Sequence, residues 1–176
     1  MTFETIFAGF GGQGILFAGK VIAYAGMIED KNVSHLPSYG PEMRGGTASC
    51  SVIVSDEDVA SPIITEPTAL VVMNGPSFDK FVKAVVPGGK IFMDSTLISS
   101  KCERDDVDAY EIPATQMAND MGIPKLANMI MVGKLVKETN MFTWEQLEGA
   151  VTKLVPAAKA AMLESNIKAL KAGYEF

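Results

Sequence analysis

The chain has 176 residues, enough for one domain that buries about two thirds of the surface its unfolded form exposes. Hydrophobic residues make up 48% and charged residues 20% of the sequence, a composition that excludes a disordered chain. The formal net charge of -6 argues against binding to nucleic acid, which requires a basic surface, and against binding to an anionic membrane.

The first half of the chain predicts apolar strands that alternate with helices. A short apolar run at Thr5–Ala8 predicts a buried strand, and the glycine run Gly9–Gly14 predicts a tight turn. The next segment has helical spacing and is apolar on several sides, so we expect a helix covered on more than one face. Further strands are expected at Asn32–Leu36, Thr47–Val54, Thr68–Met73 and Lys90–Asp94, with a helix at Ser77–Val85.

The second half predicts mainly helices. Thr143 followed by Gln146 is typical of a capping box at a helix N-terminus. We expect a strand at Val107–Ile112 and helices at Pro113–Met121, Asn128–Glu138, Thr143–Leu154 and from Pro156 to just before Gly173. The whole pattern predicts one domain over residues 1–176, a three-layer α/β/α fold with a mostly parallel sheet.

The glycine run fits the pattern GxGxxG and stands between a strand and a helix. Glycines allow a tight turn and let a phosphate approach the N–H groups at the start of the helix. The acid that a dinucleotide fold places at the end of its second strand is missing, since that strand continues into His35, Leu36 and Pro37. Two interpretations stay open, a site for a phosphate-bearing ligand at Gly11, Gly12, Gln13 and Gly14, or a purely structural turn.

A second glycine-containing loop, SYGPEMRGG, extends from Ser38 to Gly46. In a parallel sheet it would rise at the same carboxyl edge as the first glycine loop. Arginine is suited to bidentate binding of carboxylate or phosphate, so Arg44 is a candidate ligand residue; its alternative is an ion pair with Glu42 in solvent. The candidate binding residues of this loop are Tyr39, Glu42, Arg44 and Gly45.

The remaining sequence offers no catalytic constellation. We find no paired carboxylates, no metal triad and no nucleophile elbow, so we assign no catalytic and no metal-binding residue. Cys50 and Cys102 stand far apart and no CxxC occurs, which indicates reduced thiols and no cysteine-ligated cluster. The N-terminal sequence lacks the apolar core of a signal peptide, so we expect a cytoplasmic protein.

The two glycine motifs in order resemble the gamma subunit of the 2-oxoacid:ferredoxin oxidoreductases. The resemblance rests on GFGGQGI and SYGPEMRGG, and it continues to the C-terminal NIKALKAGYE. Between them lie the matching segments Ile64–Pro67, Val86–Ser95, Ile112–Thr115 and Ala127–Met129. The resemblance therefore spans the whole chain.

This resemblance implies a subunit of a complex that converts a 2-oxoacid, coenzyme A and oxidised ferredoxin into acyl-CoA, carbon dioxide and reduced ferredoxin. It places thiamine diphosphate, Mg and [4Fe–4S] clusters on sister subunits, and it implies alpha and beta partners, with a delta subunit in complexes that have one. Among the 2-oxoacids the resemblance favours 2-oxoglutarate, with pyruvate and branched-chain acids as alternatives. We expect the isolated chain to be inactive and to self-associate, as a homodimer.

Two other functions remain open from the sequence. GxGxxG is compatible with a free-standing NAD(P)-binding oxidoreductase of the Rossmann type, and the loops could brace neighbouring subunits in a purely architectural role. If the loops hold a ligand, coenzyme A is the phosphate-bearing substrate that must come and go. We therefore expect the amides of Gly11–Gly14 and the charge of Arg44 to help bind it.

Overall fold

The computed structural model describes residues 1–38 and 46–176. Its six-stranded sheet has the order β2-β3-β1-β4-β5-β6. The strands are β1 (Thr2–Phe10), β2 (Asn32–Ser38), β3 (Thr47–Ser55), β4 (Ala69–Val72), β5 (Lys90–Asp94) and β6 (Asp108–Ile112). Strands β1, β4, β5 and β6 pair in parallel, whereas β3 is antiparallel to both β1 and β2. The expected mostly parallel sheet is confirmed, with β3 as its exception.

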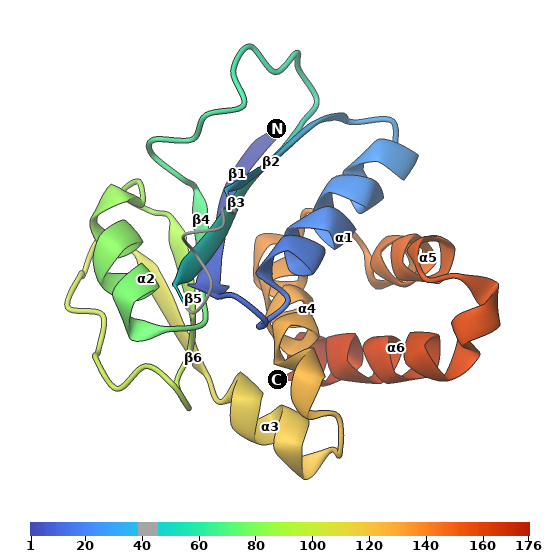
Figure 1. The fold of residues 1–176 in the computed structure, drawn as a ribbon. Helices are drawn as coiled ribbons and strands as arrows, with labels where there is room; N and C mark the ends of the chain where they lie inside the picture. The colour runs from blue at the N-terminus through green and yellow to red at the C-terminus, as the bar shows by residue number, and fades with distance from the viewer. Residues whose placement is uncertain (39–45) are drawn as a thin grey trace.

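Helices cover both faces of this sheet (Figure 1). Helices α1 and α4 pack against one face with α5 and α6 outside them, and α2 lies on the other face. The helices are α1 (Ile15–Ile28), α2 (Gly75–Phe81), α3 (Ala114–Asp120), α4 (Ala127–Thr139), α5 (Trp144–Leu154) and α6 (Ala160–Glu175), with short 3-10 turns at Val82–Ala84, Pro124–Leu126 and Ala157–Lys159. The expected three-layer α/β/α arrangement is therefore confirmed. No helix in the described part of the chain is both long and apolar enough to cross a bilayer.

Two apolar cores lie on opposite faces of the sheet. Phe7 of β1 belongs to the core beneath α1 and α4, whereas its neighbours Ile6 and Ala8 belong to the core beneath α2. This alternation follows from the period of two in a strand. Both cores lead to the same carboxyl edge of the sheet, where the loops after β1, β4 and β5 emerge.

Helix α1 is covered on more than one face, as its all-round apolar sequence predicts. It packs against β2, β3, α4 and α5, and Val21, Ile22 and Ala25 are fully buried. Most of its apolar surface is therefore covered within the chain, and self-association of the isolated chain stays a prediction.

The helix boundaries agree with the sequence at α5 and differ at α6. The Thr143 hydroxyl accepts the backbone N–H of Gln146 at 3.3 Å, and the Gln146 side chain accepts the N–H of Thr143 at 2.8 Å, which confirms the capping box. The last helix was expected to start at Pro156 and stop before Gly173. Instead, a 3-10 turn precedes α6, and α6 continues through Gly173 to Glu175.

Gly173 stands inside α6 because α4 crosses it at backbone contact. A Cβ on Gly173 would lie 1.8 Å from the carbonyl oxygen of Ile130, and a Cβ on Gly133 of α4 would lie 2.0 Å from that of Leu170. Each helix thus contributes one glycine to a close crossing. The glycine that suggests a helix end in the sequence serves helix packing in the structure.

We predict that Gly173→Ala lowers the free energy of unfolding by at least about 2 kcal/mol, since the clash is with backbone and no side-chain rotation relieves it. The matched control is Gly149→Ala in α5, where an added Cβ meets nothing within 4 Å. There alanine should be neutral or stabilise by up to about 1 kcal/mol through helix propensity. Urea unfolding followed by circular dichroism measures both; equal effects at the two positions would contradict the close crossing.

Candidate functional site

The first glycine loop joins β1 to α1 in a conformation that requires glycine at two positions. Gly12 has φ +93° and Gly14 has φ +75°, in the region that residues with a Cβ rarely adopt. Gly14 is the N-cap of α1. The Gln13 backbone N–H closes the turn by donating to the Phe10 carbonyl at 3.2 Å.

The side chain of Gln13 holds this loop against the sheet. Its amide oxygen accepts the N–H of Phe10 at 2.6 Å, and its amide nitrogen donates to the carbonyl of Met73, just after β4, at 2.9 Å. These two bonds tie the end of β1 to the end of β4. The sequence placed Gln13 among the ligand residues; in the structure its side chain shapes the loop, and ligand contact by this residue stays a prediction.

The N-terminus of α1 is left open to an incoming group. Helix α1 has no side-chain N-cap and no acidic residue in its first turn, and the first N–H groups of a helix have no intrahelical acceptor. A cavity of about 300 Å³ lies over this end of the helix. It is lined by Phe10, Gly11, Gly12, Gly14, Ile15, Leu16, Phe17 and Ala48. Backbone N–H groups and the positive helix end favour an anion, and the apolar side chains favour a short apolar chain beside it.

Asn128, at the start of α4, holds the end of the glycine loop through a hydrogen bond. Its side-chain nitrogen donates to the Gly14 carbonyl at 3.0 Å. Asn128 is only 3% exposed, and its Oδ1 has no hydrogen-bond partner in the described structure. A Cβ on Gly14 would lie 2.5 Å from the Asn128 amide nitrogen, so a side chain at position 14 would displace this amide in addition to straining φ.

Sequence reasoning gave Asn128 no role at this site, because 114 residues separate it from Gly14. Its only local signal is a polar side chain within the apolar run Ala127–Val132. That signal does not identify the partner.

The ends of the second loop lie beside the first. Phe10 pairs with Thr47, and Ser38 at the end of β2 pairs with Ser49 of the same strand β3. The N–H of Gly11 donates to the Gly46 carbonyl at 3.2 Å. Since β3 is antiparallel to both its neighbours, β1 and β2 run in the same direction and end at the same edge. The expected shared edge is thus confirmed by the flanking residues. The candidate residues Tyr39, Glu42, Arg44 and Gly45 lie outside the described part of the chain.

Two polar residues at this edge serve as caps. Asn74 accepts the N–H of Ser77 at 2.8 Å and caps α2. The fully buried Asp94 accepts the hydroxyl of Thr115 at 2.5 Å and the N–H of Thr96 at 3.1 Å, which ties the end of β5 to the start of α3.

The histidine and the cysteines stand apart from the glycine loop. His35 lies in β2, where burial and then the charge of Lys20 lower the pKa of its imidazole. Burial raises the pKa of the Cys50 thiol to about 12, so Cys50 stays protonated and packs beneath α1. Cys50 and Cys102 contact the cores on opposite faces of the sheet, so they do not form one ligand set. Among residues 1–38 and 46–176 no group of three metal-ligating side chains comes together.

We predict that Gln13→Ala lowers the free energy of unfolding by about 1–3 kcal/mol, because it removes two hydrogen bonds, to the Phe10 N–H and to the Met73 carbonyl, that contribute about 0.5–1.5 kcal/mol each. The amide of Phe10 should also exchange faster with solvent. Gln116→Ala is the control, since among the described residues the side chain of Gln116 bonds only the exposed Asp120 within its own helix, and its loss should cost about 0.5 kcal/mol or less. Chemical unfolding measures the stability of both variants, and hydrogen exchange measures the protection of the Phe10 amide. Unchanged protection in Gln13→Ala would exclude the hydrogen bond between Gln13 and Phe10.

Known proteins resemble this chain over nearly its full length. The sequence model of the family described as pyruvate ferredoxin/flavodoxin oxidoreductase matches residues 4–176. The 2-oxoglutarate synthase subunit KorC of Methanocaldococcus jannaschii is 36% identical over 175 residues, which are 98% of this chain and 92% of KorC. The ketoisovalerate oxidoreductase subunit VorA of Methanothermobacter thermautotrophicus is 38% identical over 169 residues, 96% of this chain. This chain spans about a third of the length of VorA (35%).

A solved structure shows the same fold. The gamma subunit of a keto/oxoacid ferredoxin oxidoreductase from Geobacter sulfurreducens superposes with a TM-score of 0.84 at 32% sequence identity. The match covers 98% of this chain and 96% of that subunit.

Proposed function

The chain belongs to the pyruvate ferredoxin/flavodoxin oxidoreductase family, and on this premise we propose that it is the gamma subunit of a multisubunit 2-oxoacid:ferredoxin oxidoreductase. The complex would convert a 2-oxoacid and coenzyme A into acyl-CoA and carbon dioxide and pass the electrons to ferredoxin. The observation that carries the proposal is the end-to-end match with a relative named as a single gamma subunit, which covers 98% of this chain and 96% of that subunit.

The 2-oxoacid that we propose is 2-oxoglutarate. KorC, which is named a 2-oxoglutarate synthase subunit, matches this chain along 92% of its own length, whereas VorA corresponds to this chain over only 35% of its own. The alpha and beta subunits, a delta subunit in complexes that have one, and ferredoxin would be its partners.

The residues of this chain support a role that is incomplete without those partners. The cysteines lie on opposite faces of the sheet, so they do not form one set of cluster ligands. The hydrogen-bonding groups of the buried Asp94 are used within the fold. Thiamine diphosphate, Mg and the [4Fe–4S] clusters would therefore sit on the sister subunits and supply the decarboxylation and electron transfer there. The part of this chain would be to position a substrate beside them.

We propose that the substrate held by this chain is coenzyme A. The open N-terminus of α1 would receive its phosphate groups, and the apolar wall formed by Phe10, Leu16 and Phe17 would contact its pantetheine arm. The amides of Gly11–Gly14 would donate to the ligand, and Arg44 would supply a positive charge from the neighbouring loop. Tyr39, Glu42 and Gly45 complete the proposed set of binding residues.

The proposed function requires that the isolated chain be inactive. Purified alone, with 2-oxoglutarate, coenzyme A and thiamine diphosphate, it should not reduce a viologen dye. Co-expressed with its alpha and beta partners it should support turnover, with 2-oxoglutarate preferred over pyruvate and 2-oxoisovalerate in kcat/KM. Turnover by the chain alone would refute the subunit role, and a preference for another acid would refute only the substrate.

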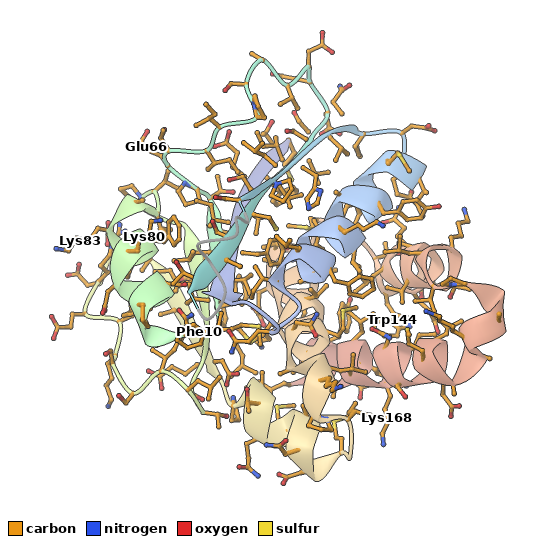
Figure 2. The ribbon with its side chains drawn as sticks, viewed as in Figure 1. Phe10, Glu66, Lys80, Lys83, Trp144 and Lys168 are labelled. Atoms are coloured by element: carbon orange, nitrogen blue, oxygen red, sulfur yellow. The ribbon has the colours of Figure 1, made fainter. Side chains whose placement is uncertain are left out.

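In the assembled complex, we predict that Arg44→Ala raises the KM for coenzyme A by about ten-fold or more. Losing one charge-assisted hydrogen bond costs about 1.5–3 kcal/mol, and each factor of ten corresponds to about 1.4 kcal/mol. The KM for the 2-oxoacid should not change, because that substrate binds on the sister subunits. Lys168→Ala, at an exposed site on α6 (Figure 2), is the matched loss of a positive charge and should leave both constants unchanged. Normal assembly of Arg44→Ala with an unchanged KM for coenzyme A would exclude the proposed contact.

A further inference from the structure

A groove between α1 and the edge strand β2 has chemistry that the coenzyme A proposal does not use. Its volume is about 420 Å³. Its lining comes from α1, from β2 and from the turn that joins them, and Figure 1 shows these two elements away from α2 and from the outer helix α6. The lining residues are Lys20, Ala23, Tyr24, Met27, Lys31, Asn32, Val33 and His35.

The strand that forms one wall of this groove has an open edge. Strand β2 is the first in the sheet order and pairs only with β3 among the described strands. Its sequence, NVSHLPS, contains no Asp, Glu, Lys or Arg, although charged side chains are a common means by which edge strands avoid pairing with other chains. Pro37 lacks an N–H group, but it stands next to the end of the strand, so most of β2 keeps its outward backbone groups.

The charges around the groove have one sign. Lys20 comes from the second turn of α1 and Lys31 directly precedes β2, whereas no carboxylate of residues 1–38 and 46–176 lines the groove. Lys31 shares its charge with Asp56 through an exposed ion pair. Lys20 therefore provides the charge that faces an incoming group, because burial and Lys20 itself lower the pKa of His35. This positive charge favours an acidic partner at the groove.

Apolar surface lies between these charges. Met27 is 56% exposed, and Tyr24 on the preceding turn is half-buried. Lys20, Tyr24 and Met27 follow one another along the same side of α1 at spacings of four and three residues, so a straight segment laid along the groove would meet a positive, then an aromatic, then an apolar side chain.

We infer that this groove and the edge of β2 bind an extended acidic segment of another protein chain. Such a segment would add to the sheet as a further strand beside β2, with main-chain hydrogen bonds along the edge. Its carboxylates would reach Lys20, and its apolar side chains would contact Tyr24 and Met27. The inference goes beyond the gamma-subunit role and does not depend on coenzyme A binding.

A second copy of this chain fits the groove less well. If two β2 edges paired antiparallel about a two-fold axis at the central residue His35, the Lys20 side chains, which lie near His35, would approach each other, and like charges at this distance disfavour the pair. Charge complementarity therefore favours an acidic partner over self-pairing.

The test uses the full chain and a short synthetic peptide of alternating Glu and Val with blocked ends. Peptide titration should shift the amide signals of Lys20–Met27 and Val33–Leu36 in a ¹⁵N correlation spectrum, and added salt should weaken binding. Lys20→Glu should weaken the peptide's Kd by at least about ten-fold, and Lys20→Gln by a smaller factor. Lys168→Glu on α6 is the matched control for charge reversal and should leave the Kd within about two-fold.

Three outcomes would overturn the inference. The first is no binding of the Glu–Val peptide at millimolar concentration, or shifts confined to other residues. The second is equal binding of a peptide in which Lys replaces Glu, which would exclude charge recognition. The third is concentration-dependent dimerisation of the chain, measured by sedimentation, that the peptide does not displace and that involves the β2 amides; a second copy would then occupy the edge.

Discussion

The rest of the structure depends on the position of β1 between β3 and β4. Its backbone pairs antiparallel with β3 on one side and parallel with β4 on the other. Its side chains enter both cores, with Phe7 on one face and Ile6 and Ala8 on the other. Because β1 is held on both edges and both faces, the loop that leaves its carboxyl end starts from a fixed point, and the N-terminus of α1 has a fixed direction.

The glycine loop takes its shape from contacts that are distant in sequence. Gln13 joins the ends of β1 and β4, and Asn128 reaches the Gly14 carbonyl from the start of α4. These side chains use their polar groups on the loop itself, and the first N–H groups of α1 have no side-chain cap. The proposed anion site would consist of backbone N–H groups, which carry no side-chain signature beyond the glycines, so composition alone does not identify its ligand.

The proposed roles divide the surface of the molecule by chemistry. The carboxyl edge presents helix N–H groups and apolar side chains, which suits the phosphate and pantetheine portions of coenzyme A. The groove beside β2 presents lysines and an open strand edge, which suits an acidic protein segment. In the proposed role, a subunit that only positions groups for its neighbours needs such binding surfaces and no nucleophile of its own. The sequence contains neither paired carboxylates nor a nucleophile elbow.

The sequence by itself determined the elements whose signals are local. Alternation or apolar runs located β1, β3, β4 and β5, and Thr143 with Gln146 located the start of α5, because side-chain period and capping depend on residues a few positions apart. The glycine run indicated the turn after β1 and the open helix end for the same reason.

Tertiary structure alone decided that β3 is antiparallel and lies between β1 and β2, since alternation identifies a strand but not its neighbours. It also decided that Asn128 supports Gly14, and that Gly173 lies inside α6. A glycine near the end of an amphipathic pattern predicts a helix end. Only the structure shows that Gly173 lacks a side chain for packing, because a Cβ there would lie 1.8 Å from the Ile130 carbonyl oxygen of α4.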